Sequence, residues 1–336
     1  MRILHAVRSD AFAGVERHVA SLAAAQVSAG HRVAVVGGDP VALRAALGPR
    51  VPHRPAATVA EVAAAVRGWR GGDVVHAHMT AAEIAVALAA PTRAVVTTRH
   101  FAGTRGASRA GRLAEPALRR RIAAQIAISR YVADHVDGPS TVVPVGVPDR
   151  PDGRPAGDRA RTVLLAQRLA PEKDGATAVR AFALSGLAAR GWGLDVAGRG
   201  TEWAALERLA ARLGVADAVT FLGPRSDVGD LMARAGVLLA PCPVEGLGLA
   251  VLEAMAAGLP VVAAAAGGHL ETVGTVDGAA LFAPGEAGAA GAALAALAAD
   301  PARRDAYGAE LRRAQRTRFT LTAQVAGTDA VYRSVL

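Results

Sequence analysis

An apolar strand, a glycine-containing loop and a helix follow one another in Val237-Leu-Leu-Ala-Pro-Cys-Pro-Val-Glu-Gly-Leu-Gly-Leu-Ala-Val-Leu-Glu253. The run Val237–Ala240 is typical of a strand that is covered on both faces. The helix predicted over Leu249–Ala257 ends at Gly258, which is followed by Leu-Pro. A buried strand that leads through a short loop into a helix indicates an α/β fold with a parallel sheet.

Two glutamates flank this loop. Glu245 lies in the loop and Glu253 lies two turns into the helix, so one molecule of roughly nucleotide-sugar length could contact both. A capping carboxylate plus a surface glutamate is the simpler alternative, but Glu253 lies inside an apolar run. Glycines allow the backbone to approach a ligand closely, and free amides at a helix N-terminus favour a phosphate. The loop residues expected to bind it are Gly246, Leu247, Gly248 and Leu249.

A second stretch, Leu165-Ala-Gln-Arg-Leu-Ala-Pro-Glu-Lys-Asp174, carries two cations, Arg168 and Lys173. Lys173 is the only lysine in the chain, which uses arginine for every other cationic side chain. A compact ammonium differs from the planar guanidinium in what it can bind, so this lysine indicates a specific site. A solvated loop is the alternative.

The alternation of strands and helices occurs twice, on either side of a Pro- and Gly-rich linker at 148–161. We therefore predict an N-terminal domain over 1–150 and a C-terminal domain over 151–316, each with a parallel sheet. Open sheets of this kind bind ligands at the carboxyl ends of their strands, and we expect a cleft between the two domains. The predicted strands are Arg2–Val7, Arg32–Val36, Val74–His76, Ala94–Thr98, Ile126–Ile128, Thr141–Val143, Thr162–Ala166, Leu194–Ala197, Val219–Leu222, Val237–Ala240 and Pro260–Ala263.

Dinucleotide chemistry is not expected, because no strand is followed by a complete Gly-x-Gly-x-x-Gly motif. The stretch Gly198-Arg-Gly-Thr-Glu-Trp203 lacks the third glycine, although Gly198 remains a candidate for donor binding. The first loop of the chain ends in Gly14 at a predicted helix N-terminus, where backbone amides can meet a phosphate.

These motifs resemble glycosyltransferase family 4, a group of retaining enzymes with the GT-B fold of two facing Rossmann-like domains. The resemblance covers nearly the whole chain. It implies that Glu245 contacts the donor sugar, that Glu253 contacts the donor ribose, and that the loop between them binds the diphosphate together with Arg168 and Lys173. It also implies that a final helix in the tail, about 317–336, packs back on the N-terminal domain.

The N-terminal domain resembles the family less closely. Ala13-Gly-Val-Glu16 corresponds to the family's Gly-Gly-x-Glu loop with one glycine lost, and Asp73-Val-Val-His-Ala-His78 corresponds to its Asp-hydrophobic-hydrophobic-His-x-His strand end. Thr97-Thr-Arg-His100 resembles its Thr-x-His, whose histidine lies beside the reacting sugar. The resemblance makes His100 a candidate catalytic residue. Glu16, His78 and Arg99 become candidates on the acceptor side.

We expect front-face displacement in which the leaving phosphate acts as the base. The nucleotide-diphosphate sugar is the only co-substrate expected, with no cofactor and no metal ion; we expect His76 and His78 to face opposite sides of their strand and not to share a metal. A GT-B sugar-nucleotide epimerase and an inactive sugar-nucleotide binding module are the rival classes.

The acceptor is not determined by these motifs. Residues 1–150 hold 19 arginines against 10 acidic residues and so carry the whole formal charge of +9. Seven arginines lie within 99–121 (99, 105, 109, 112, 119, 120 and 121), with only Glu115 against them. This arginine cluster has three interpretations. It could contact an anionic membrane or lipid-linked acceptor, it could bind a soluble small-molecule acceptor such as a natural-product intermediate, or it could be a solvated helix face.

Nucleic acid is not expected, because no aromatic residues alternate with these arginines. A single cysteine and an N-terminus unlike a secretory signal favour the cytoplasm, with peripheral contact at the inner membrane face as an option.

Overall fold

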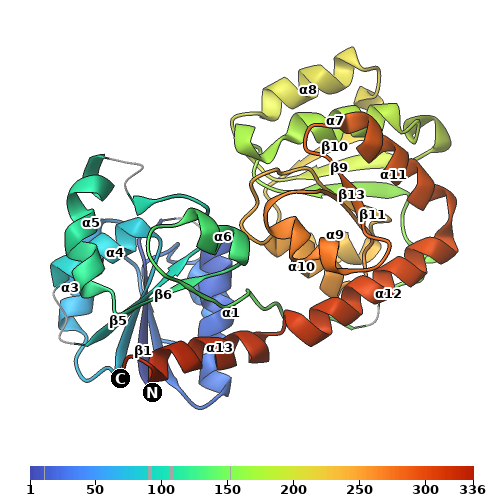
Figure 1. Cartoon of the computed structure of the whole chain (residues 1–336). Coiled ribbons are helices and arrows are strands. Elements are labelled where there is room, and N and C mark those ends of the chain that lie inside the picture. Colours follow the sequence, from blue (N-terminus) through green and yellow to red (C-terminus); the bar gives the residue numbers. More distant parts are fainter. Residues whose placement is uncertain (11, 90–92, 106–108, 152) are drawn as a thin grey trace. The chain divides into compact units, whose positions relative to one another are not determined.

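The computed structural model describes all residues except 11, 90–92, 106–108 and 152, and it divides the chain into two compact units (Figure 1). Unit 1 comprises Met1–Gly146 and Thr320–Leu336, and unit 2 comprises Val147–Phe319. Each unit contains one parallel sheet with helices packed on it. The predicted fold class, two α/β domains with parallel sheets, is confirmed.

Unit 1 is built on a seven-stranded sheet with the order β3-β2-β1-β4-β5-β6-β7. The strands are β1 Arg2–Val7, β2 Arg32–Val36, β3 His53–Arg54, β4 Val74–His78, β5 Ala94–Arg99, β6 Ala124–Ala127 and β7 Thr141–Val142. The helices are α1 Gly14–Ser28, α2 Ala42–Leu47, α3 Val59–Gly68, α4 Thr80–Ala89, α5 Arg109–Arg121, α6 Arg130–His135 and α13 Leu321–Arg333.

Alternate residues of β1 pack on opposite faces of this sheet. Ile3 and Val7 belong to the core that includes residues of α1 and α13, whereas Leu4 and Ala6 pack with residues of α3 and α4. Two buried apolar faces on one strand explain why β1 is a continuous apolar run. Figure 1 shows α13 lying beside α1.

Unit 2 has a six-stranded parallel sheet with the order β10-β9-β8-β11-β12-β13. Its strands are β8 Thr162–Ala166, β9 Gly193–Ala197, β10 Val219–Gly223, β11 Val237–Ala240, β12 Val261–Ala264 and β13 Ala280–Phe282. Its helices are α7 Gly175–Leu184, α8 Trp203–Arg212, α9 Val228–Arg234, α10 Leu249–Ala256, α11 Ala287–Ala299 and α12 Pro301–Arg318. Several single 3-10 turns, among them η3 Pro171–Lys173 and η6 Gly267–Leu270, connect these elements.

In both units the first strand lies inside the sheet, and successive strands are added first on one side of it and then on the other. The strand order therefore reverses once, between β1 and β4 in unit 1 and between β8 and β11 in unit 2. The loops at the carboxyl ends of strands beside such a reversal are where open α/β sheets bind ligands. In unit 2 these loops are the Arg168–Lys173 segment after β8 and the Glu245 loop after β11.

Candidate functional site

The loop after β11 is shaped by glycines from two segments. Gly248 is the N-cap of α10 and has a φ of +92°, in the left-handed region that glycine adopts without strain. A Cβ atom on Gly268 would lie 2.3 Å from Cα of Leu247, and one on Gly267 would lie 2.6 Å from the carbonyl oxygen of Glu245. The Gly267-Gly268 pair therefore packs directly against the loop and fixes the position of Glu245.

Lys173 and Glu245 meet although 72 residues separate them. The ammonium Nζ of Lys173 lies 2.6 Å from Oε2 of Glu245, and the two side chains are 13% and 22% exposed. Burial acts to raise the pKa of the Glu245 carboxyl, but the charge and hydrogen bond of Lys173 outweigh it and leave this pKa below its ordinary value. The Glu245 side chain is therefore a carboxylate at neutral pH.

The segment that carries Lys173 is locked by its own short-range bonds. The Gln167 side chain donates to the carbonyl oxygen of Lys173 at 2.9 Å. Asp174 adopts a left-handed φ of 48°, and its carboxylate caps α7 by accepting from the amide of Thr177. Lys173 thus projects from a turn between two anchored residues.

Arg168 does not join this pair. Its guanidinium is 57% exposed and donates to Glu172 at 2.9 Å, on the surface of the same segment. The backbone around it is nevertheless tightly placed, because Cβ atoms on Gly198 and Gly200 would lie 1.8 Å and 2.0 Å from the carbonyl oxygens of Gln167 and Leu169. The absence of a side chain at Gly198 therefore allows the loop after β9 to pack closely against this segment.

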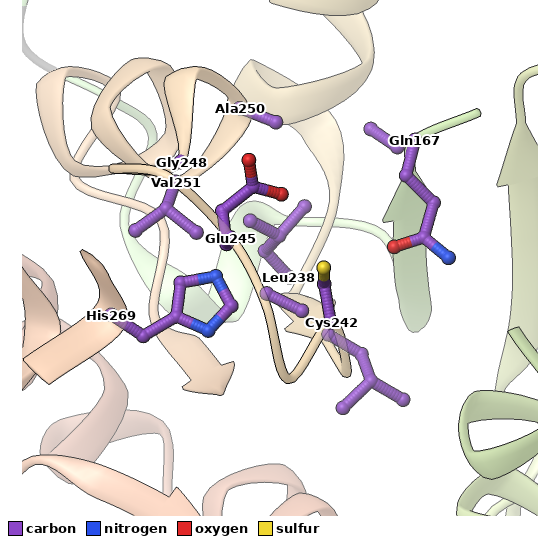
Figure 2. Close-up of a pocket in the computed structure, with 11 residues that line it drawn as sticks. Gln167, Leu238, Cys242, Glu245, Gly248, Ala250, Val251 and His269 are labelled. Carbon is purple, nitrogen blue, oxygen red and sulfur yellow. The ribbon is translucent and has the colours of Figure 1, made fainter. Parts of the chain in front are cut away.

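A small pocket lies beside the Lys173–Glu245 pair, and the sequence analysis did not select one of its residues, His269. Figure 2 shows the imidazole of His269 beside Glu245, with Gln167 on the opposite side. Nδ1 of His269 lies 3.2 Å from the carbonyl oxygen of Ala264 and must donate to it. Burial lowers the pKa of His269, so the ring is neutral and its Nε2 carries a lone pair. The run Ala-Gly-Gly-His after β12 was the signal that could have identified it.

The other lining residues of the pocket come from β8, β11, the Glu245 loop and α10; they are Ala166, Gln167, Leu238, Leu239, Ala240, Cys242, Gly248, Ala250 and Val251. Burial raises the pKa of the Cys242 thiol to about 11, so this residue is an uncharged filler at neutral pH. Leu247 is buried beneath the loop, and Glu253 is half-buried on α10, one to two turns beyond Leu249. Gly246 is buried at the loop's first turn.

The candidates at the start of α1 have mainly local roles. Glu16 is buried, and its carboxylate accepts from the amide of Ala13 at 2.9 Å, which caps the helix. Gly14 is exposed, has an ordinary negative φ, and its missing Cβ would meet no atom within 4 Å. Its contact with a phosphate stays a prediction.

The histidines of β4 correct one expectation. Side chains two residues apart on a strand point to the same face. The rings of His76 and His78 indeed stack with centroids 4.3 Å apart, so the expectation of opposite faces is wrong. Nδ1 of His78 lies 3.1 Å from Nε2 of His100, and both residues are buried. The two candidates His78 and His100 are therefore in direct contact.

The expected basic surface over 99–121 needs a second correction. Arg105 is buried and pairs with Glu83 at 2.7 Å and with Asp137. Arg99 is also buried and donates to the Gly103 carbonyl oxygen at 2.7 Å and to Asp137. These two arginines hold the loop that follows His100 and offer no charge to a membrane. Arg99 would have to leave both partners to contact an acceptor. The side chains of arginines 109, 112 and 119 lie outside the described part.

Comparison with known proteins gives two family matches. Glycosyl transferases group 1 matches residues 150–314, and Glycosyltransferase Family 4 matches residues 12–150. The 2-deoxystreptamine glucosyltransferase of Streptomyces kanamyceticus is 32% identical over 196 residues, which cover 54% of this chain and 49% of that protein. A GDP-mannose-dependent alpha-(1-6)-phosphatidylinositol monomannoside mannosyltransferase of Mycobacterium tuberculosis is 40% identical over 121 residues, 33% of this chain and 31% of the relative.

Among solved structures, Anabaena Alr3699/HepE in complex with UDP-glucose has a TM-score of 0.79 and 22% identity, and the match covers 99% of this chain and 100% of that one. At that identity the likeness shows a shared fold. The chain spans about half the length, or less, of the curated relatives named above. None of the described helices combines the length and the apolar character needed to cross a membrane.

Proposed function

Since two glycosyltransferase families together match residues 12–314, the chain belongs to the glycosyltransferases of family 4, and we propose that it transfers a sugar from a nucleoside-diphosphate sugar to an acceptor hydroxyl. The observation that carries the proposal is the partly buried Lys173–Glu245 pair near the N-terminus of α10. A cation beside free helix amides attracts a diphosphate, and a carboxylate next to it can bind sugar hydroxyls.

In this proposal unit 2 holds the donor. Lys173 and the amides at Gly248 and Leu249 bind the diphosphate, Glu245 accepts from hydroxyls of the sugar, and Glu253 accepts from the ribose. Arg168 reaches the phosphates by exchanging its exposed partner Glu172, and an exposed pair of this kind costs little to break. The two cations balance the leaving charge, and no metal or further cofactor is invoked.

We propose retention of configuration by front-face displacement. The bond between the anomeric carbon and the phosphate oxygen breaks while the acceptor oxygen bonds to the same face of that carbon. The acceptor proton passes to the departing phosphate oxygen. Lys173 favours this step because negative charge grows on the diphosphate as the bond breaks.

For the acceptor we propose a small soluble hydroxylated molecule that is bound on unit 1. The relative from Streptomyces kanamyceticus acts, by its name, on 2-deoxystreptamine. The burial of Arg99 and Arg105 in ion pairs takes two charges from the basic surface that a membrane acceptor would need. The alternative is a lipid-linked acceptor at the inner membrane face, in line with the name of the mycobacterial relative.

The test is incubation of the purified chain with a panel of UDP-, GDP- and dTDP-sugars, with slow donor hydrolysis followed by mass spectrometry. Turnover of one donor by the native chain, and its loss in Lys173→Met, would support the proposal. Arg313→Ala is the matched control, because the side chain of Arg313 lies exposed on α12 in an ion pair with Glu310. Absence of turnover with every donor, together with no donor binding, would refute it.

Two further experiments test the stereochemistry and the acceptor class. Once an acceptor is found, the proton coupling constant at the anomeric carbon reports retention. Co-sedimentation with anionic vesicles at low and high salt separates the two acceptor classes.

A further inference from the structure

Five buried histidines lie on the face of the unit 1 sheet that α1 and α13 cover: His5, His18, His76, His78 and His100. Burial lowers the pKa of each of them, to about 4 for His5 and, with help from the charge of Arg99, to about 3 for His100. They are therefore neutral at physiological pH, and each ring carries one N–H donor and one bare nitrogen.

Three of these rings form a continuous hydrogen-bonded chain that ends at a glutamine. Gln26 Oε1 lies 2.7 Å from Nε2 of His5, Nδ1 of His5 lies 2.9 Å from Nε2 of His78, and Nδ1 of His78 lies 3.1 Å from Nε2 of His100. We call Gln26–His5–His78–His100 the imidazole chain. A proton on one nitrogen of any ring dictates the arrangement in all the others, because each contact needs one donor and one acceptor.

The imidazole chain has only two consistent proton arrangements, and the Gln26 amide selects between them. If Oε1 faces His5, then Nε2 of each histidine carries the proton and Nδ1 of His100 is bare. If the amide were rotated by 180°, its NH2 group would donate to His5 and every proton would move to Nδ1.

The second contact of Gln26 decides in favour of the first arrangement. Nε2 of Gln26 lies 3.4 Å from the hydroxyl of Tyr332, which lies 2.6 Å from Nδ1 of His76. The hydroxyl of Tyr332 is fully buried, and Nδ1 of His76 is the one acceptor at a normal O–H distance that the described residues give it. Tyr332 therefore donates to His76, Nε2 of His76 donates to Thr98 at 2.7 Å, and only the oxygen lone pairs of Tyr332 are left for Gln26. A rotated amide would instead need an O–H···O bond at 3.4 Å, far beyond the usual length.

At the end of the imidazole chain, Nδ1 of His100 forms no hydrogen bond to any described residue. It is also not among the side-chain nitrogen and oxygen atoms that are sealed from solvent without a partner, which within the described part belong to Arg304, Gln315 and Asp329. This nitrogen therefore reaches accessible surface at the carboxyl end of β5, where unit 1 can bind a ligand.

We propose that Gln26 and Tyr332 are positioning residues that fix His100 as the Nε2–H tautomer, so that its bare Nδ1 accepts a hydrogen bond from a hydroxyl of the substrate. The proton arrangement is a property of unit 1 alone, and only the substrate contact rests on the proposed function. The same histidines could instead share a metal ion, since the ligand atoms within each of two groups, His5/His76/His78 and His18/His78/His100, lie within 4.8 Å of one another.

The direct test uses the full chain labelled with ¹⁵N-histidine at pH 7.5, where long-range ¹H–¹⁵N spectra distinguish protonated from bare ring nitrogens. Single His→Gln variants assign the signals. We expect His5, His78 and His100 to show a protonated Nε2 and a bare Nδ1. A protonated Nδ1 on His100 would overturn the inference, and so would signals that shift with one equivalent of Zn²⁺ and return with EDTA. Neither result depends on activity, so this failure is distinct from failure of the proposed function.

Gln26→Met keeps the length of the side chain and removes the acceptor that orders the chain. The thioether sulfur is only a weak acceptor, so the N–H on Nε2 of His5 loses most of its stabilisation, and the arrangement with every proton on Nδ1 becomes populated beside the first one. We expect Nδ1 of His100 to carry a proton in a fraction of the molecules and kcat to fall in proportion to that fraction, with KM for the donor unchanged. Gln315→Met makes the same chemical change at a buried glutamine of unit 2 and should alter neither the His100 signals nor kcat. An unaltered kcat in Gln26→Met, in a sample whose spectrum shows a proton on Nδ1 of His100, would refute the substrate contact.

Discussion

Replacement of Lys173 by methionine tests the central ion pair of the site. The substitution keeps the aliphatic stem and removes the ammonium that lies 2.6 Å from Glu245. Because Glu245 is only 22% exposed, it is left as a poorly solvated carboxylate, and we expect the unfolding free energy of unit 2 to fall by about 1–3 kcal/mol. We also expect the pKa of Glu245 to rise, since Lys173 is what holds it below its ordinary value.

The effect on turnover should be larger than the effect on folding. Loss of one fixed donor to a charge that develops in the transition state costs about 3 kcal/mol, or roughly a hundredfold in kcat. The assay is donor turnover by mass spectrometry at saturating donor, with denaturant unfolding on the same samples. A double-mutant cycle with Glu245→Gln should give a coupling of about 1 kcal/mol or more, because the two side chains touch.

Two results would contradict this reasoning. If Lys173→Met turns over the donor at the native rate while it remains folded, the ammonium does not stabilise the leaving diphosphate. If the loss of turnover is matched by Arg313→Ala, whose side chain is exposed on α12, the effect is not specific to the pair.

Three further perturbations have defined outcomes. Gly198→Ala should destabilise unit 2 by at least roughly 2 kcal/mol, since its Cβ would lie 1.8 Å from a backbone oxygen at a φ of +154°. In the control Gly288→Ala the new Cβ would meet no atom within 4 Å, so this variant should be neutral or stabilising in thermal unfolding. Equal melting temperatures of the two variants would refute the packing argument. Arg105→Met should lower the unfolding free energy by about 3–5 kcal/mol, because Glu83 would stay buried without its cation; the exposed Arg225→Met serves as the control, and equal denaturant midpoints would contradict the assigned role. For the five buried histidines the folded pKa lies below the unfolded value, so they contribute stability above pH 6.5 that is lost as the pH falls toward about 4; a denaturant midpoint that stays constant between pH 7 and pH 5 would be inconsistent with neutral burial.

Much of the fold follows from local pattern. The runs at Arg2–Val7, Arg32–Val36, Thr162–Ala166 and Val237–Ala240 are strands with the predicted ends, because apolar β-branched stretches bounded by glycine or charge have few other stable conformations. The strands His53–Arg54 and Ala280–Phe282 were missed. Each is two or three residues long at a sheet edge, and its conformation is set by the neighbouring strand rather than by its own sequence.

The site was predictable where a motif is compact in sequence and unpredictable where partners are distant. Glu245 and Lys173 were selected from separate motifs, and the structure brings them together. Nothing in the sequence indicates that Arg99 pairs with Asp137, which lies 38 residues away, so its role on the acceptor side stays a prediction. His269 was missed although the run Ala266-Gly-Gly-His269 after β12 marks a loop, because its place beside Glu245 depends on how that loop packs on the loop after β11.

The return of α13 to the first sheet has a consequence for biosynthesis. Tyr332 contacts His76 at the centre of that sheet, and Asp329 bonds to His31 at 2.8 Å. The domain that leaves the ribosome first therefore lacks part of its interior until residues 320–336 have been translated. Nascent unit 1 stays incompletely closed while Val147–Phe319 of unit 2 are translated, and it is exposed to chaperones and proteases during that interval.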